Sequence, residues 1–213
     1  MVWRIQDGYR CSLKPCSRSV PGQCSLPFGV ASVVAILNAE RFLIDPHDSE
    51  WVHIARFKWL LLAHGVAGMI ALITGAVQLS TRIRRCRVKL HRVTGRIYVV
   101  TVAAASLIAL YINAKFEPWP LNFEVAVQAT LWLSATTVGY IAARYRQMVL
   151  HRQWMVRSYA ITLIFIASRL PIYPNFNATE LSTMLWYLIV GALILPDLLE
   201  TTVQLARSRQ VSQ

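Results

Sequence analysis

Two short motifs rich in histidine and arginine carry the side chains of this sequence that are best suited to chemistry. The first reads HRVTGRIY, from His91 to Tyr98, and the second reads HRQWMVRSY, from His151 to Tyr159. An imidazole can ligate a metal or exchange a proton, and a guanidinium can bind a phosphate or carboxylate through two hydrogen bonds. Each motif stands where a basic stretch gives way to an apolar run, so each places these groups at the edge of a hydrophobic helix.

Several interpretations of the motifs stay open. We predict that they form one site, the rim cluster, which binds an anionic head group or a cofactor at helix N-termini. The rim cluster consists of His91, Arg92, Arg96, His151, Arg152 and Arg157. One alternative is a b-type haem held between His91 and His151. Another is that the basic residues only orient the helices in the membrane. The prediction leans away from an enzyme, because the sequence holds no nucleotide-binding loop, serine-hydrolase elbow or zinc-protease motif.

The composition predicts that the apolar runs next to these motifs form helices that lie in a membrane. Of the 213 residues, 55% are hydrophobic and 15% are charged, against roughly 25% charged residues in ordinary soluble domains. Residues 59–81, 97–114 and 125–143 contain no Lys, Arg, Asp or Glu. About 20 such residues in a helix cross the hydrocarbon core of a bilayer. We therefore predict an all-α integral membrane bundle.

The run lengths predict about six transmembrane spans. The first, at residues 26–44, is short or degenerate because Asn38, Glu40 and Arg41 interrupt it. The other five cover residues 58–80, 95–114, 123–143, 153–171 and 181–204. Most basic residues fall between the second and third spans, between the fourth and fifth, and after the last. The positive-inside rule places these segments, and the C-terminus, in the cytoplasm. The net charge of +12 thus indicates membrane lipids as partners and not nucleic acid.

Three regions are expected along the chain. Residues 1–27 form a polar N-terminal tail, residues 28–205 the transmembrane domain, and residues 206–213 a basic cytoplasmic tail. The cysteines of the first tail lack the spacing of a zinc site. Carboxylates and histidines precede the second span, but their spacing is typical of a solvated acidic loop, and no metal is expected. These loop residues are Asp45, His47, Asp48, Glu50 and His53.

Small and polar residues form a stripe along the second span. The spacing of four, three, four and three residues puts them on one helix face. Small residues between two polar ones indicate close helix packing with hydrogen bonds at both ends, which we favour over a ligand site. The stripe consists of His64, Gly68, Ala71, Gly75 and Gln78.

The fifth span carries a second polar stripe. His151, Ser158, Thr162 and Arg169 are separated by seven, four and seven residues, which again puts them on one face. Because polar groups are costly in lipid, the stripe should face the interior of the bundle. A small solute transporter that uses this stripe is the remaining functional alternative.

The two motifs also define an internal repeat. Spans two and three, and spans four and five, form hairpins that run in the same direction, as in parallel repeats of membrane proteins. The repeat predicts that His91 and His151 converge on one side of the membrane. Arginines gathered there need carboxylate partners, and we expect Asp197 or Glu200 within their reach.

Three segments together resemble a known family. They are the run from His64 to Gln78, the motif from His91 to Tyr98, and the stretch from His151 to Ala160 followed by Arg169. Over roughly residues 55–205 they resemble the bacterial predicted membrane proteins grouped as domain of unknown function 2306. The resemblance implies a multi-pass protein of the bacterial inner membrane. It also implies probable site positions, namely His64, Gln78, His91, Arg92, Gly95, Arg96, His151, Arg152, Trp154, Met155, Arg157 and Arg169. The chain departs from the family at residues 1–44, where only a broken apolar helix occurs.

Overall fold

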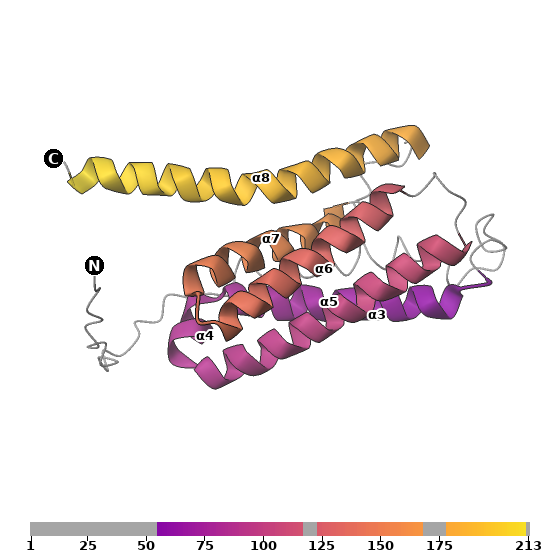
Figure 1. Ribbon diagram of the computed structural model, residues 1–213, viewed down its shortest axis with the longest axis horizontal. Helices are drawn as coiled ribbons and strands as arrows, with labels where there is room; N and C mark the ends of the chain where they lie inside the picture. The colour runs from indigo at the N-terminus through magenta and orange to yellow at the C-terminus, as the bar shows by residue number, and fades with distance from the viewer. Residues whose placement is uncertain (1–54, 117–122, 168–177, 212–213) are drawn as a thin grey trace, which may run out of the picture.

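The computed structural model describes residues 55–116, 123–167 and 178–211, and all the regular structure within them is helical. Five long helices and one short helix follow one another along the chain (Figure 1). They are α3 (Lys58–Leu79), α4 (Thr81–Cys86), α5 (Val88–Phe116), α6 (Phe123–Arg144), α7 (Met148–Ala167) and α8 (Ala178–Val211).

The long helices carry apolar side chains on their outer faces as well as on their packed faces. In α3, for example, Val66 and Ile73 point outward with exposed fractions of 52% and 58%. A helix that is apolar all round belongs in a membrane or a large core. Helices α3, α5 and α6 are long and apolar enough to cross a membrane.

The predicted spans can now be compared with these helices. Spans 58–80, 95–114 and 123–143 fall on α3, α5 and α6, and spans 153–171 and 181–204 overlap α7 and α8. The all-helical fold is confirmed, while the count of six spans stays a prediction. The first predicted span, 26–44, lies outside the described residues. Helix α8 continues beyond residue 205, the expected end of the transmembrane domain, to Val211.

Four of the long helices form a closed ring in which each helix packs against the next. The contacts run from α3 to α5, α5 to α6, α6 to α7, and α7 back to α3, and α8 packs mainly on α7. Successive long helices run in opposite directions (Figure 1). Helices α5 and α7 therefore run in the same direction on one diagonal of the bundle. Both begin at the end where α4 lies, which we call the basic end.

The stripe of α3 forms the seam with α5. Ala71 is fully buried, and Gly68 and Gly75 are buried with it. At one end of the stripe, His64 Nδ1 donates to the carbonyl oxygen of Ala105 at 2.9 Å. At the other end, Gln78 Nε2 donates to the carbonyl oxygen of His91 at 2.9 Å and also contacts the Thr94 hydroxyl. The prediction of close packing with a hydrogen bond at each end is confirmed.

A closed ring of hydrogen bonds, the hydroxyl ring, joins α5, α6 and α7 at the centre of the bundle. Trp132 Nε1 donates to Thr162 Oγ1 at 3.0 Å, and Thr162 Oγ1 lies 3.0 Å from the Tyr98 hydroxyl. From Tyr98 the ring passes to Ser158 Oγ at 2.7 Å and then to Thr136 Oγ1 at 2.6 Å. It ends where Thr136 donates to the carbonyl oxygen of Trp132 at 2.8 Å.

When each hydroxyl of the ring donates once in this order, every one of them has a hydrogen-bond partner. Burial of the ring therefore leaves no hydroxyl unpaired. Thr162 Oγ1 has a second acceptor within reach, the Ser158 carbonyl oxygen of its own helix at 3.0 Å. Ser158 and Thr162 are both almost fully buried. The prediction that the stripe of the fifth span faces the interior is confirmed at these two positions.

Candidate functional site

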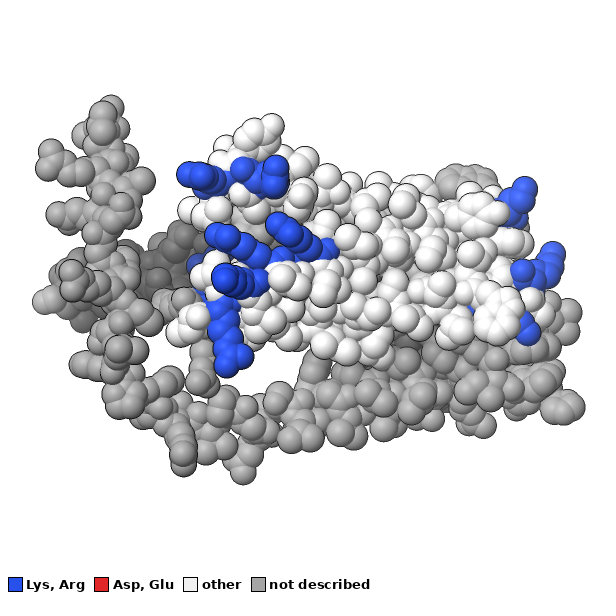
Figure 2. Space-filling model, turned by 90° about the horizontal axis from the view of Figure 1, so that it is seen from below, with Lys and Arg blue, Asp and Glu red and all other residues white. Residues whose placement is uncertain are grey.

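Exposed basic side chains surround the basic end of the bundle. They come from α4, the first turns of α5, the end of α6 and the start of α7, and they form the larger group of blue side chains in Figure 2. The turn from α6 into α7 is tight, with Arg146 in the left-handed backbone region at φ 60°. The exposed residues are Arg84, Arg87, Lys89, Arg92, Arg96, Arg144, Arg146 and Arg152.

His91 and His151 lie at this end on the two helices of the diagonal, α5 and α7. Tyr98 on α5 and Ser158 on α7 are hydrogen-bonded at 2.7 Å. His91 lies seven residues before Tyr98, and His151 lies seven residues before Ser158. Seven residues make two helical turns, so each histidine lies on nearly the same face of its helix as the bonded residue. Because α5 and α7 run in the same direction, the two imidazoles occupy the same depth. The fold thus brings both histidines to the same end of the bundle, and the close approach of the two imidazoles stays a prediction.

Burial and nearby positive charge both act on the His91 imidazole. His91 lies before the uncharged stretch of α5, which begins at Ile97. Burial lowers the pKa of the His91 imidazole, and positive charge on His151 and on Arg84 lowers it further. Both histidines also stand in the first turn of their helices, where the helix dipole opposes a positive charge. The site therefore favours a neutral His91 imidazole, and its positive surroundings attract anions.

The ring nitrogens of the two histidines are used differently. His151 Nδ1 lies 2.8 Å from the carbonyl oxygen of Gly139 on α6. A carbonyl can only accept, so this nitrogen carries the proton and Nε2 is the nitrogen left for a ligand. His91 Nδ1 is buried and has no hydrogen-bond partner among the described residues. A buried polar atom without a partner is rare and indicates a missing ligand or a strained site.

Arg157 does not face the two histidines. Its Nη2 donates to both carboxylate oxygens of Asp197 on α8 at 2.7 Å, and its guanidinium stacks over the Trp154 ring at 4.8 Å. The expectation of a carboxylate partner is confirmed for Asp197, while the side chain of Glu200 lies outside the described part. Arg157 follows His151 by six residues, about 240° around the helix, so it meets a different neighbour.

The remaining arginines of the rim cluster are exposed. Arg92, Arg96 and Arg152 form no ion pair with any carboxylate in the described ranges, and neither does Arg84. The geometry thus divides the predicted cluster. The exposed arginines of the basic end have no carboxylate partner among the described residues, and Arg157 with Trp154 forms a separate contact to α8.

The other candidates lie elsewhere. His64 is near the opposite end of α3, where it bonds Ala105 and packs edge-on against Phe165. Gln78 donates a hydrogen bond to the backbone carbonyl oxygen of His91, which joins α3 to α5. Arg169 and the acidic loop at 45–53 lie outside the described residues.

The sequence reasoning missed two members of the hydroxyl ring, Trp132 and Thr136. Both lie within an uncharged run that was interpreted only as a span. Their spacing of four residues puts them on one face of α6, and buried Trp N–H groups usually need a partner. That combination was the available signal.

The pairing of Arg157 with Asp197 should hold the second half of α8 on the bundle. We expect Asp197→Asn to cost about 1 kcal/mol or less, because Asp197 is half exposed and exposed ion pairs are weak. Amide hydrogen exchange after Pro196 should then rise by up to about fivefold. Thr201→Ala, an exposed change one turn further along α8, is the matched control. Equal exchange in the two variants would show that the pair does not hold the helix.

The comparison with known proteins gives one family and no closer relative. A family model described as "Predicted membrane protein (DUF2306)" matches residues 61–200. No curated protein and no solved structure matches the chain. The matched range includes both histidine-arginine motifs and reaches from α3 into α8. It confirms the resemblance drawn from those motifs.

Proposed function

Because the chain belongs to the DUF2306 family of predicted membrane proteins, we propose that it binds an anionic head group at the basic end of its bundle. In this proposal the protein crosses a bacterial inner membrane several times, and the basic end and the C-terminus face the cytoplasm. The observation that supports the proposal is the set of exposed arginines at the basic end that have no carboxylate partner among the described residues.

The charge balance of the site supports an anion as the ligand. Arg92 and Arg96 on α5 and Arg152 on α7 are exposed at the basic end and have no carboxylate partner in the described residues. The first turns of α5 and α7 add the positive ends of two helix dipoles. A bound anion would offset the positive charge of Arg84, which is one of the causes that lower the pKa of His91.

The apolar residues between these charges support a head group as the source of the anion. Val93 on α5 and Val149 on α7 are 54% and 72% exposed at the basic end. Such residues are unfavourable in water but fit the boundary between acyl chains and head groups. Arginine side chains at that depth extend toward the phosphates.

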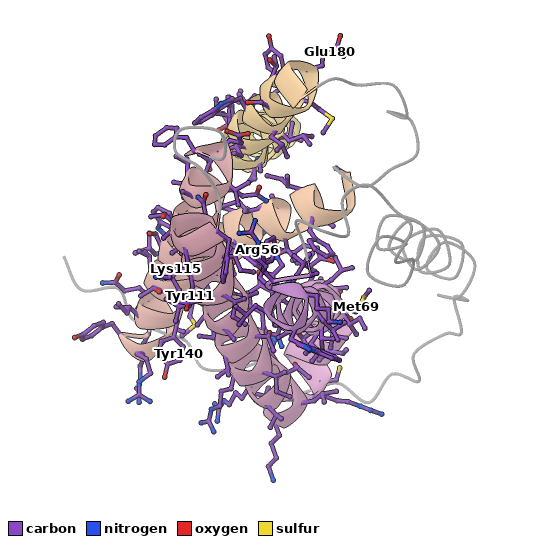
Figure 3. The ribbon with its side chains drawn as sticks, turned by 90° about the vertical axis from the view of Figure 1, so that its right-hand side faces the viewer. Arg56, Met69, Tyr111, Lys115, Tyr140 and Glu180 are labelled. Carbon is purple, nitrogen blue, oxygen red and sulfur yellow. The ribbon has the colours of Figure 1, made fainter. Side chains whose placement is uncertain are left out.

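Paired charge removal tests this proposal. Each basic residue near a membrane surface contributes about 1 kcal/mol to attraction of anionic lipid. We expect Arg92→Gln with Arg152→Gln to weaken association with spin-labelled phosphatidylglycerol by about thirtyfold, measured in phosphatidylcholine bilayers. The matched control is Arg56→Gln with Lys115→Gln, which removes the same charge at the opposite end, viewed in Figure 3. An equal loss in both pairs would contradict the proposal.

A b-type haem between His91 and His151 is the second candidate. The Nδ1–H of His151 on the Gly139 carbonyl is the arrangement that orients many metal-bound histidines. The tight packing of side chains near the two histidines argues against a haem at this position. A Cβ on Gly139 would meet Met155 Sδ at 2.8 Å, and Gln78 packs on Gly95. An absorption spectrum of the reduced purified protein separates the candidates, because a b-type α-band would replace the head-group proposal.

The transporter alternative loses its basis in the described part of the chain. Ser158 and Thr162, the middle of the polar stripe, are both engaged in the hydroxyl ring. The stripe is therefore accounted for by packing between helices.

A further inference from the structure

The outward face of α6 differs from those of the other two helices that are long and apolar enough to cross a membrane. On α3 and α5 the large exposed side chains within the spans are mainly aliphatic, as Ile73 and Val100 show with exposed fractions of 58% and 66%. On α6 the exposed residues in the middle of the helix carry hydroxyls. They are Thr130, Ser134 and Thr137. Small polar side chains thus stand where lipid favours aliphatic ones.

These hydroxyl-bearing residues form one stripe. Thr130, Ser134, Thr137 and Ile141 are separated by four, three and four residues, so they lie on one face of the helix. We call these four residues the α6 hydroxyl face. Small residues at this spacing let two helix backbones approach closely in a membrane, and their hydroxyls form hydrogen bonds across the interface. The stripe is therefore suited to packing against another helix.

The hydrogen bonds distinguish this face from other threonines on the outside of the bundle. The hydroxyls of Thr74, Thr101 and Thr130 donate to the carbonyl oxygen four residues earlier in their own helix, at 2.7, 2.9 and 2.8 Å. The hydroxyls of Ser134 and Thr137 have no hydrogen-bond partner among the described residues. A polar group that faces hydrocarbon without a hydrogen bond is costly, because no water reaches it. A helix packed on this face would supply the missing partners.

We propose that the α6 hydroxyl face is the interface of a homodimer, in which α6 of one copy packs on α6 of a second copy. Both copies insert in the same orientation, so a two-fold axis runs along the membrane normal and the two α6 helices are parallel. Near that axis each residue faces its own counterpart. A hydroxyl both donates and accepts, so Ser134 and Thr137 each find a matching group on the second copy. This inference is independent of head-group binding at the basic end.

The charges along α6 favour a second copy as the occupant. Residues 125–143 contain no Lys, Arg, Asp or Glu, so no like charges meet when the face packs on itself. Arg144 ends the helix at the basic end, where water and counterions screen its repulsion from the same residue of a second copy. An unrelated helix would need hydroxyls at the same spacing, whereas a second copy presents them by symmetry.

The outward face of α8 is the competing surface for such an interface. Its exposed side chains include Tyr187, Ile194 and Leu198, with exposed fractions of 75%, 50% and 55%. Apolar groups of this kind are well accommodated by lipid, because lipid tails are as apolar as leucine. The unbonded hydroxyls therefore make α6, and not α8, the helix whose outward face gains from a protein partner.

Disulfide crosslinking tests the interface in the full chain. The four cysteines are replaced by serine, a single cysteine is introduced, and the protein is oxidised mildly in phosphatidylcholine vesicles at a low protein-to-lipid ratio. Ser134→Cys should crosslink two copies, because a disulfide requires Cα atoms within about 7 Å of each other. Ile73→Cys on α3 and Ile194→Cys on α8 are matched exposed positions and should not crosslink. Equal crosslinking at all three positions, or none at position 134, would overturn the proposal.

Removing the two hydroxyls tests the cause of the association. Ser134→Ala with Thr137→Val changes the side-chain size little but removes both hydroxyls from each copy. We expect the dissociation constant of the dimer to rise by about tenfold, measured by energy transfer between labelled copies as the vesicles are diluted with lipid. Thr74→Val with Thr101→Val, which removes two hydroxyls bonded within their own helices, is the matched control and should leave the constant unchanged. An equal effect of the two double variants, or a protein that is monomeric at every dilution, would contradict the homodimer.

Discussion

Replacing Tyr98 with alanine is expected to destabilise the bundle by about 3–5 kcal/mol, the range for removing a large buried aromatic side chain. Tyr98 is fully buried, its hydroxyl bonds to Ser158 and Thr162 on α7, and its ring lies against Gly75 of α3. Unfolding in a series of SDS concentrations would measure the loss. Tyr98→Phe, which retains the ring, should cost about 1 kcal/mol, as hydrogen bonds between membrane helices do.

An exposed tyrosine on the same helix provides the control for this measurement. Tyr111 is 53% exposed, and Tyr111→Ala should cost well under 1 kcal/mol. Similar losses for Tyr98→Ala and Tyr111→Ala would show that the centre of the bundle is not packed around Tyr98.

Gly75→Ala should be the second most damaging of the proposed changes. A Cβ at this position would lie 2.5 Å from Tyr159 Cε2 and 2.9 Å from Tyr98 Cε2, closer than side-chain carbons approach. Both rings are held by hydrogen bonds, in the case of Tyr159 to the Leu72 carbonyl oxygen at 3.4 Å. We expect a loss of about 3 kcal/mol, at the upper end of the range for overpacking, in the same unfolding assay.

Two further variants show whether the clash is the cause. A Cβ added at Gly65, also on α3, would have nothing within 4 Å of it, so Gly65→Ala should be neutral or slightly stabilising. In a Tyr159→Leu background the smaller side chain leaves room, and Gly75→Ala should cost much less there than in the unmodified protein. Additive losses at positions 75 and 159 would refute the close approach.

The sequence was sufficient to predict the helices and the packing faces that follow from periodicity. The stripe from His64 to Gln78 and the inward face of Ser158 and Thr162 follow from spacing alone, because polar and small residues in a membrane helix must pack on other helices. The short helix α4 was not predicted. Its six residues, Thr81–Cys86, are too few to give a periodic signal.

The composition of the site was harder to predict than its position. Equal depth for His91 and His151 follows from the repeat, but the division of the arginines depends on angular position. Arg157 lies six residues after His151 and therefore reaches α8. The expected pairing of the arginines with Asp197 or Glu200 did not specify which arginine would be neutralised, and the packing of α8 on α7 decides this. Among the described residues, Arg92, Arg96 and Arg152 have no carboxylate partner.

The order of bonds in the hydroxyl ring has a consequence for proton leakage. A chain of hydroxyls through a membrane protein can pass protons along if each group can accept at one side and donate at the other. This ring starts at the indole N–H of Trp132, which cannot accept, and ends at the carbonyl oxygen of the same residue, which cannot donate. Both ends of the relay are therefore blocked by one residue. Within the described residues, the buried hydroxyls therefore bind three helices together without linking the two ends of the bundle.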